Sequence, residues 1–201
     1  MGEDRYLKKM DKRLLAIYGS PRQGGNTDTL LDCFLDGASA SSAAVERVYL
    51  RDLDYTPCTE CNGCKKTGFC VIDDTLNPLF EKLLEYERVV FAYPLFFLGP
   101  PAITKAFIDR GQVLWVRKYV LGIDPVKPGV ERLAYLLSIG GFKGNENVFR
   151  CNKSILRAFL PVCGLIYAGE LFTGGIEYKG DVKRNKELGK RARESGSDFM
   201  L

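Results

Sequence analysis

Residues 13–27 read RLLAIYGSPRQGGNT, and this stretch decides the predicted fold. Residues 13–18 form a short apolar run that predicts a β-strand ending at Gly19. Apolar side chains then recur at helical spacing over residues 30–38, and Asn26 or Thr27 can cap the start of that helix. A strand that passes through a glycine-rich turn into a helix is the opening unit of an α/β protein.

The same alternation continues along the chain. The periodicity predicts four further strands, at residues 45–50, 88–93, 133–139 and 164–171. It predicts helices over residues 73–84, 100–107 and 148–159, and a terminal surface helix over 181–195. Five strands alternating with helices indicate one domain over residues 1–201, with a doubly wound parallel sheet of order 2-1-3-4-5. In such a sheet, ligands bind beyond the carboxyl ends of the strands, which here means the loops after strands one, three and four.

The composition excludes several classes of protein. The chain has 201 residues, of which 46% are hydrophobic and 27% charged, so it is neither disordered nor collagen-like. No apolar run reaches the roughly 18 residues that a membrane span requires. Residues 1–13 are charged and lack the apolar region of a signal peptide, so we expect a cytoplasmic protein. A net charge of +4 is too small to indicate nucleic-acid binding.

The sequence contains no histidine. This excludes Ser-His-Asp and Cys-His catalysis, and it excludes zinc or haem held by histidine. Acid-base chemistry near neutral pH therefore needs a perturbed side chain of another type or a cofactor that carries the proton itself.

The loop after the first strand, residues 19–27, has the features of a phosphate site. Its small residues let backbone N–H groups approach an anion at the start of a helix, where the helix dipole favours negative charge. Ser20, Asn26 and Thr27 can donate hydrogen bonds, and Arg22 supplies a forked cation suited to phosphate. The loop matches neither the P-loop nor the dinucleotide fingerprint, so a terminal monophosphate fits it better than a pyrophosphate. The alternative is an ordinary strand–helix turn.

The loops after strands three and four predict the rest of the site. Residues 93–101 read YPLFFLGPP, an unusually apolar segment for this position, and a flat aromatic ligand would explain it. Core packing and an oligomer contact remain alternatives. Residues 138–144 contain three glycines, which permit close approach of the backbone to a ligand, although a flexible turn has the same composition.

Four of the seven cysteines fall within thirteen residues, at Cys58, Cys61, Cys64 and Cys70. They lie in residues 51–72, which show no sustained periodicity and are expected to form a loop. The other three cysteines lie in apolar segments and are expected to be small buried side chains. Zinc is a weak match, because structural zinc sites separate two cysteine pairs by a dozen or more residues.

The three loops together resemble those of the NADPH-dependent FMN reductases of flavodoxin-like fold. The resemblance rests on residues 19–22 (GSPR) with Asn26-Thr27, Tyr93-Pro94, residues 105–110 (KAFIDR) and Gly140-Gly141. It implies a three-layer sandwich, FMN as cofactor and NAD(P)H as electron donor. It assigns the FMN phosphate to the first loop and the isoalloxazine ring to the other two. Lys105, Asp109 and Arg110 belong to the motif, and we expect a structural role for them. The expected FMN-binding residues are Ser20, Arg22, Asn26, Thr27, Tyr93, Pro94, Leu95, Phe96, Phe97, Ser138, Gly140 and Gly141.

The cysteine spacing C-x2-C-x2-C-x5-C resembles the compact motif of the iron-sulfur flavoproteins, a branch of the same family. That resemblance implies a [4Fe-4S] cluster on Cys58, Cys61, Cys64 and Cys70, since four thiolates are the usual ligands of such a cluster. The last gap is longer than in the bacterial ferredoxin motif, so a structural loop of free thiols is the alternative.

These observations predict an oxidoreductase that passes electrons from a nicotinamide cofactor through FMN to a small-molecule or protein acceptor. The alternative is a flavodoxin-like electron-transfer protein with no substrate of its own. Several aromatic residues lie near the expected ring site or close to the Gly- and Pro-rich excursion at residues 118–130. One small domain cannot easily bury them all, so we expect a homodimer or homotetramer.

Overall fold

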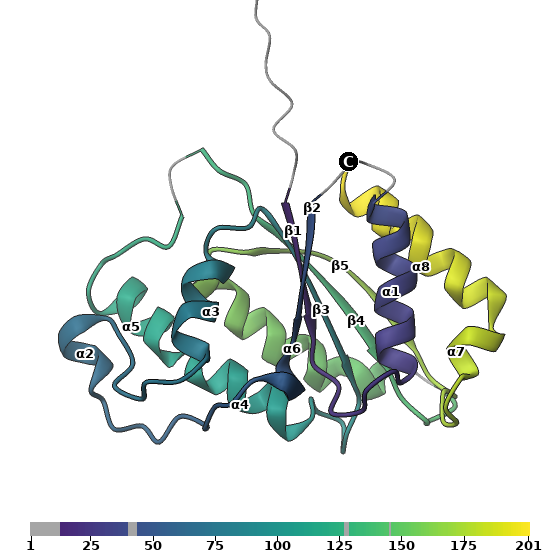
Figure 1. The fold of residues 1–201 in the computed structure, drawn as a ribbon, viewed down its shortest axis with the longest axis horizontal. Helices are drawn as coiled ribbons and strands as arrows, with labels where there is room; N and C mark the ends of the chain where they lie inside the picture. The colour runs from purple at the N-terminus through teal and green to yellow at the C-terminus, as the bar shows by residue number, and fades with distance from the viewer. Residues whose placement is uncertain (1–12, 40–43, 127–128, 145) are drawn as a thin grey trace, which may run out of the picture.

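The computed structural model describes residues 13–39, 44–126, 129–144 and 146–201, so the charged residues 1–12 lie outside the described part. The expected five-stranded parallel sheet is confirmed, with the order β2-β1-β3-β4-β5. Its strands are β1 (Arg13–Tyr18), β2 (Ala44–Tyr49), β3 (Arg88–Pro94), β4 (Leu133–Ile139) and β5 (Ile166–Thr173). The order reverses between β1 and β3, and the carboxyl ends of these strands lie at the lower edge of the sheet in Figure 1.

Helices cover both faces of the sheet and complete the three layers (Figure 1). One face carries α1 (Asn26–Ser39), α7 (Asp181–Arg184) and α8 (Lys186–Phe199). The other carries α3 (Leu76–Leu83), α4 (Ala102–Arg110), α5 (Gln112–Tyr119) and α6 (Arg150–Phe159). Among the described residues, every helix is too short or too polar to traverse a lipid bilayer.

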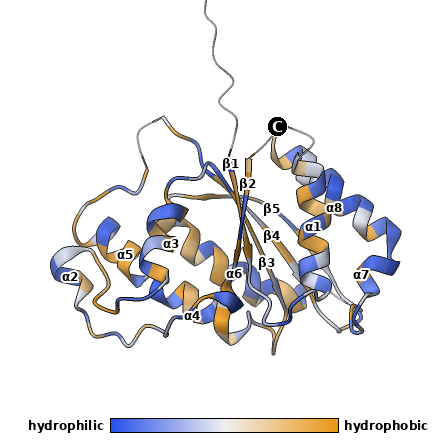
Figure 2. Cartoon of the chain, in the orientation of Figure 1, coloured by the Kyte–Doolittle hydropathy of each residue, from blue (hydrophilic) through white to orange (hydrophobic). Residues whose placement is uncertain are grey.

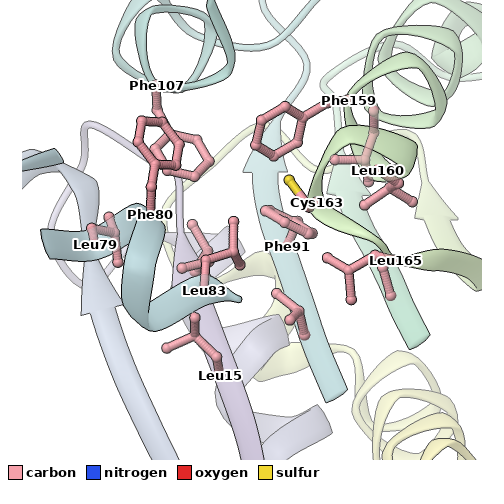
Figure 3. Close-up of a cluster of buried hydrophobic side chains, with 14 of the residues drawn as sticks. Leu15, Leu79, Phe80, Leu83, Phe91, Phe107, Phe159, Leu160, Cys163 and Leu165 are labelled. Carbon is pink, nitrogen blue, oxygen red and sulfur yellow. The ribbon is translucent and has the colours of Figure 1, made fainter. Parts of the chain in front are cut away.

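Alternation along the strands builds a core on each side of the sheet. In β1, Leu14 and Ala16 pack toward α1 and α8, whereas Leu15 and Ile17 pack toward α3, α4 and α6. Figure 3 shows this second core, in which aromatic rings from α3, α4 and α6 meet above the sheet. The Phe107 ring lies 5.4 Å from that of Phe80 and 5.5 Å from that of Phe159. Burying each such ring contributes about 1.5–3 kcal/mol to the stability of the fold. Figure 2 shows the apolar strands lying between helices with polar outer surfaces.

Two glycines set the close packing of α1 against α8. A Cβ atom at Gly37 would lie 1.9 Å from the carbonyl oxygen of Arg193, and one at Gly196 would lie 1.9 Å from that of Phe34. The terminal helix is therefore packed into the core and is more than a surface element. The segment expected as one helix also divides at Asn185, whose side chain accepts a 3.0 Å hydrogen bond from the Leu188 N–H and caps α8.

Several elements differ from the sequence expectation, among them α4, which was expected over residues 100–107 and spans Ala102–Arg110. β5 begins two residues later than expected because Gly164, with φ of 64°, closes the 3-10 turn Leu160–Cys163. Helix α5 was not expected; it follows α4 directly at Gly111, where a Cβ would lie 2.4 Å from the Phe159 ring. The first residues of the expected excursion, 118–119, belong to α5. The remainder of the excursion has no regular secondary structure where the structure describes it, and residues 127–128 lie outside the described part.

The cysteine-rich segment is mostly irregular, as expected, and contains two short helical turns. The first is the 3-10 turn Leu50–Asp52 and the second is α2 (Cys64–Thr67). α2 ends at Gly68, which has φ of 76° and donates a 2.8 Å hydrogen bond to the carbonyl of Cys64. In Figure 1, α2 lies at the outer end of the layer formed by α3 to α6, on the side of the sheet opposite to α1.

Candidate functional site

The loop after β1 is fastened to its neighbours on both sides. The Gly19 N–H donates a 2.7 Å hydrogen bond to the Ala92 carbonyl of β3. The Gly19 carbonyl accepts a 2.7 Å hydrogen bond from Thr104 Oγ1 of α4. A Cβ atom at position 19 would lie 2.4 Å from Thr104 Oγ1, so only glycine allows α4 to approach the loop this closely. The start of the loop is therefore fixed by packing.

An ion pair beneath the loop fixes its second half. Arg51 contacts the Asp28 carboxylate at 3.0 Å and donates a 3.2 Å hydrogen bond to the Ser20 carbonyl. Asp28 also accepts a 2.9 Å hydrogen bond from the N–H of Gly24, which has φ of 60°. Burial raises the pKa of Asp28 above its ordinary value, although its contacts with Arg51 oppose the shift. The two charges compensate each other, which leaves Arg22 as the exposed cation of the loop.

Asn26, expected to donate to a ligand, uses its side chain within the protein. Its Nδ2 donates to the Tyr178 carbonyl at 2.8 Å, and its Oδ1 accepts from the N–H groups of Gly180 and Val182 at 3.0 and 3.3 Å. This side chain ties the start of α1 to the segment after β5. The first backbone N–H groups of α1 remain available because the start of a helix has no acceptors within the helix.

The loop after β3 forms a small hairpin that projects an aromatic ring. Phe96 and Gly99 exchange two backbone hydrogen bonds of 2.8 and 2.9 Å. The two residues between them, Phe97 and Leu98, have φ of 47° and 64°, the left-handed region that bulky side chains rarely adopt. The Phe97 side chain is fully exposed. Such strain costs of order 1–3 kcal/mol per residue and is typical of functional sites.

The loop after β4 lies against the hairpin. Leu95 donates a 2.7 Å hydrogen bond to the Ile139 carbonyl, and a Cβ at Gly140 would lie 3.3 Å from the Leu95 side chain. The Gly140 N–H donates to the Thr173 carbonyl at 3.0 Å, and its carbonyl accepts from the Ile176 N–H at the same distance. The glycine at position 140 thus lets three loops meet.

These loops enclose a cleft of about 380 Å3 at the point where the strand order reverses. The cleft brings together nine of the twelve expected residues: Ser20, Arg22, Asn26, Thr27, Pro94, Leu95, Phe96, Gly140 and Gly141. The other three, Tyr93, Phe97 and Ser138, are absent from its lining. Tyr93 and Ser138 are buried beneath it, and Phe97 points into solvent.

The structure adds five lining residues to the expected set: Pro21, Gly25, Ile139, Ile176 and Glu177. Ile176 and Glu177 come from the segment after β5, which Asn26 and Asp181 hold in place. The Asp181 carboxylate accepts hydrogen bonds from the Glu177 and Tyr178 N–H groups at 2.9 and 2.7 Å, and the Tyr178 hydrogen bond is the main cause of a lowered pKa for Asp181. This wall was not expected from the sequence, although Gly174-Gly175 marks a loop after β5 and permits close approach of the backbone.

The cleft has two chemically different ends. One end combines the start of α1 with Arg22, whose guanidinium has no ion-pair partner within the described residues. The other end is apolar, with Leu95, Phe96, Ile139 and Ile176 on its walls. This arrangement suits a flat, largely apolar ligand with an anionic end.

All four clustered cysteines line a second, small cavity. The Glu60 N–H donates a 3.4 Å hydrogen bond to Cys58 Sγ, and the left-handed φ values of Glu60 and Asn62, 55° and 59°, curl the chain around the cavity. Burial raises the pKa of the Cys64 thiol. Within the described ranges, no group of three or more metal-ligating side chains is arranged to hold a single metal ion. Lys65 and Lys66 are exposed to solvent.

The KAFIDR motif divides into a surface pair and a buried arginine. Lys105 and Asp109 form an exposed ion pair at 2.6 Å, one helical turn apart. The Arg110 side chain is fully buried and contacts the Asp74 carboxylate at 2.5 Å. Of the isolated cysteines, Cys163 is buried and Cys33 is half-buried. The expectation for Cys151 was wrong: it lies on the solvent face of α6.

The strand order and the layers of helices define a flavodoxin-like α/β protein, with a cleft at the point where the strand order reverses. The model of the NADPH-dependent FMN reductase family matches residues 12–158, and the chain belongs to this family. It is an NAD(P)H-dependent flavin oxidoreductase, and FMN is the flavin that gives the family its name.

Individual relatives agree with this assignment. An iron-sulfur flavoprotein of Methanosarcina thermophila is 26% identical over 169 residues, covering 83% of this chain and 82% of that protein. An iron-sulfur flavoprotein of Methanocaldococcus jannaschii is 32% identical over 102 residues, about half of each chain. The solved NAD(P)H:quinone oxidoreductase of Methanothermobacter marburgensis shares the fold with a TM-score of 0.73 at 18% identity, covering 94% of this chain and 96% of that one.

Proposed function

We propose that this chain binds FMN in the cleft, takes electrons from NAD(P)H and passes them to an acceptor by way of an iron-sulfur cluster on the four clustered cysteines. The observation that carries the proposal is the cleft at the strand-order reversal, which combines the start of α1 with apolar loops. FMN held in the cleft would supply the redox chemistry, namely acceptance of a hydride from the reduced nicotinamide and onward release of electrons. The chain needs to supply position and electrostatics only, in agreement with the absence of histidine.

The phosphate of FMN belongs at the first loop. Arg22 supplies a charge-assisted contact, and Ser20 and Thr27 supply hydroxyl groups beside the start of α1. Asn26 contributes through its backbone, because its side chain is already committed to the segment after β5. The Asp28–Arg51 ion pair stabilises the loop conformation. Because Arg51 neutralises the Asp28 carboxylate, the pair adds no net negative charge near the phosphate.

The isoalloxazine ring belongs between the hairpin after β3 and the loop after β4. Pro94, Leu95 and Phe96 offer one wall, and the Gly140-Gly141 backbone offers the other. Tyr93 and Ser138 support these walls from below, since Ser138 Oγ donates to the Tyr93 carbonyl at 2.8 Å and accepts from Asn152 Nδ2 at 2.9 Å. Phe97 follows Phe96 in the hairpin and is fully exposed, so we expect it to cover the ring or a partner.

The four cysteines fit an iron-sulfur cluster by their donor chemistry, because their thiols share one cavity and a backbone N–H already donates to one sulfur. The cavity is only about 20 Å3, so the surrounding irregular loop, residues 58–63, must move outward to admit a cluster. Such a cluster suits one-electron transfer, so it is also compatible with a second candidate function, an electron carrier that uses no substrate of its own.

One experiment separates the two functions. The FMN-loaded protein is mixed with NADPH or NADH without oxygen, and the flavin absorption is followed over time. Rapid bleaching supports the reductase. Bleaching by a reduced ferredoxin alone supports the carrier, and a protein that takes up no FMN contradicts both.

The exposed aromatic residues support a homo-oligomer. Phe96, Phe97, Trp115 and Tyr119 are each at least 41% exposed in the single chain. Aromatic side chains are enriched at protein interfaces, although Trp115 and Tyr119 lie on α5, away from the cleft. A second copy that covers the hairpin would shield the flavin from water.

A further inference from the structure

Arg110 occupies the last turn of α4, and its side chain is fully buried. Its Nη1 donates to the Thr56 carbonyl at 2.9 Å and to the Asp74 carboxylate at 2.5 Å. Its Nη2 donates to the same carboxylate at 3.0 Å and to the Ile72 carbonyl at 3.3 Å. The guanidinium is thus held rigidly against both ends of the cysteine-rich segment.

Asp74 is itself anchored, so the ion pair is built into the fold. Its Oδ1 accepts a 3.0 Å hydrogen bond from the Leu76 N–H at the start of α3. Burial would raise the pKa of Asp74, but the hydrogen bonds from Arg110, Leu76 and Thr56 outweigh it and lower the pKa. The carboxylate is therefore charged and holds Arg110 in one orientation.

One donor of Arg110 remains unused. Its Nε is buried and makes no hydrogen bond of standard geometry among the described residues, although both Nη atoms make several and the Cys70 side chain interacts with the guanidinium. Leaving such a donor unpaired costs about 1–3 kcal/mol, more for a charged group. Arg110 also lines the cavity that the four cysteines share. Burial lowers the pKa of Arg110, and Asp74 and the neighbouring Cys70 raise it above its ordinary value.

We propose that Arg110 is a tuning residue for the iron-sulfur cluster, with its Nε–H as a hydrogen-bond donor to a sulfur and its charge as a counterion. The inference rests on the cluster in the proposed function. Hydrogen bonds to the sulfurs and the net charge around a cluster set its reduction potential. A cluster becomes more negative when it is reduced, so a buried cation beside it stabilises the reduced form and raises the potential.

A purely structural role for Arg110 predicts something different. If the Arg110–Asp74 pair only clamps the segment, removing either partner loosens the same loop and shifts the potential in the same direction. If the pair acts through charge, removing Arg110 favours the oxidised cluster, whereas neutralising Asp74 favours the reduced cluster. The two substitutions therefore have opposite effects only under the proposal.

The test is an anaerobic redox titration of the full-length, FMN-loaded protein, with the reduced cluster measured by electron paramagnetic resonance. The variants are Arg110→Gln and Asp74→Asn. The matched control is Lys105→Gln, which removes an exposed cation from the same helix. We expect at least a tenfold lower ratio of reduced to oxidised cluster at a fixed potential for Arg110→Gln, equivalent to 59 mV for a one-electron couple. We expect a higher ratio for Asp74→Asn and no change for Lys105→Gln.

The outcomes separate the inference from the proposed function. Wild-type protein that binds FMN but takes up no iron overturns the cluster and this inference together. Iron-loaded protein in which both variants shift in the same direction, or do not shift, overturns the inference alone. If Arg110→Gln assembles no cluster, it is replaced by Arg110→Lys, which keeps the positive charge and lacks Nε. If Arg110→Lys also assembles no cluster, the sign of the shift in cluster potential for Asp74→Asn decides.

Discussion

The hydroxyl of Thr104 donates a 2.7 Å hydrogen bond to the backbone carbonyl of Gly19, 85 residues earlier in the chain. The bond joins α4 to the loop that opens the candidate phosphate site. Both groups are buried, and the absence of a Cβ at Gly19 is what permits the approach. The shape of the first loop therefore depends on a helix that does not line the cleft.

Thr104→Val is expected to destabilise the protein and weaken FMN binding. Valine has nearly the shape of threonine but cannot donate, so the Gly19 carbonyl is left buried without this partner, at a cost of about 1–3 kcal/mol. The free energy of unfolding in urea and the FMN dissociation constant measure the two effects. Thr104→Ser keeps the hydroxyl and should bind FMN as the wild type does. Equal stability and affinity of Thr104→Val and wild type would show that the bond does not hold the loop.

Arg22→Ala is expected to weaken FMN binding by about ten- to a hundredfold and to leave the fold intact. A hydrogen bond to a charged group contributes about 1.5–3 kcal/mol, and the exposed Arg22 side chain makes no packing contribution to lose. Fluorescence titration with FMN measures the affinity. Arg191→Ala on α8 removes an equally exposed cation far from the cleft and serves as the control. If both variants bind FMN equally well, Arg22 has no part in the site.

The sequence predicted the sheet and most of the cleft because both depend on local signals. Strands such as β3 are continuous apolar runs, the alternation of strands and helices indicates a parallel sheet, and five strands favour the order 2-1-3-4-5. The glycine-rich loops after strands one and four could be predicted because their composition is also a local signal. Nine of the expected FMN-binding residues consequently line one cleft.

The remaining features depend on long-range contacts that no local pattern records. Ile176 and Glu177 reach the cleft because Asn26 holds the segment after β5, a pairing 152 residues apart in sequence. The left-handed turn at Phe97 was not predicted, because such turns ordinarily use asparagine or glycine. The environment of Arg110 Nε could not be predicted from the sequence, because it forms only when residues 56–77 fold back onto α4.

Phe97→Asp is expected to separate the oligomer into 22.5 kDa chains without destabilising them. Phe97 is fully exposed in the single chain, so a charge at this position costs nothing unless a second copy covers it. Aspartate also tolerates the left-handed φ of this position better than phenylalanine. Sedimentation velocity at micromolar concentration measures the assembly. Ile166→Asp, at the opposite end of the sheet, is the control. A wild-type protein that sediments as one 22.5 kDa species refutes the oligomer.

Cys64→Ala is expected to lose iron and to retain FMN. The cysteines share a cavity separate from the cleft, so removing one ligand should leave the flavin site unchanged. Iron content and flavin content are measured on anaerobically purified protein. Cys151→Ala removes an exposed cysteine on α6 and should keep both. Unchanged iron in Cys64→Ala would remove this residue from the cluster.

The most direct test of the account is titration of the flavin-free protein with FMN and, separately, with riboflavin, which lacks the phosphate. With the phosphate at Arg22 and the start of α1, we expect one FMN per chain and at least tenfold weaker binding of riboflavin, the effect of one charge-assisted contact. Arg22→Ala should narrow this difference. Equal affinity for the two flavins, or no binding of FMN, would contradict the assignment of the cleft.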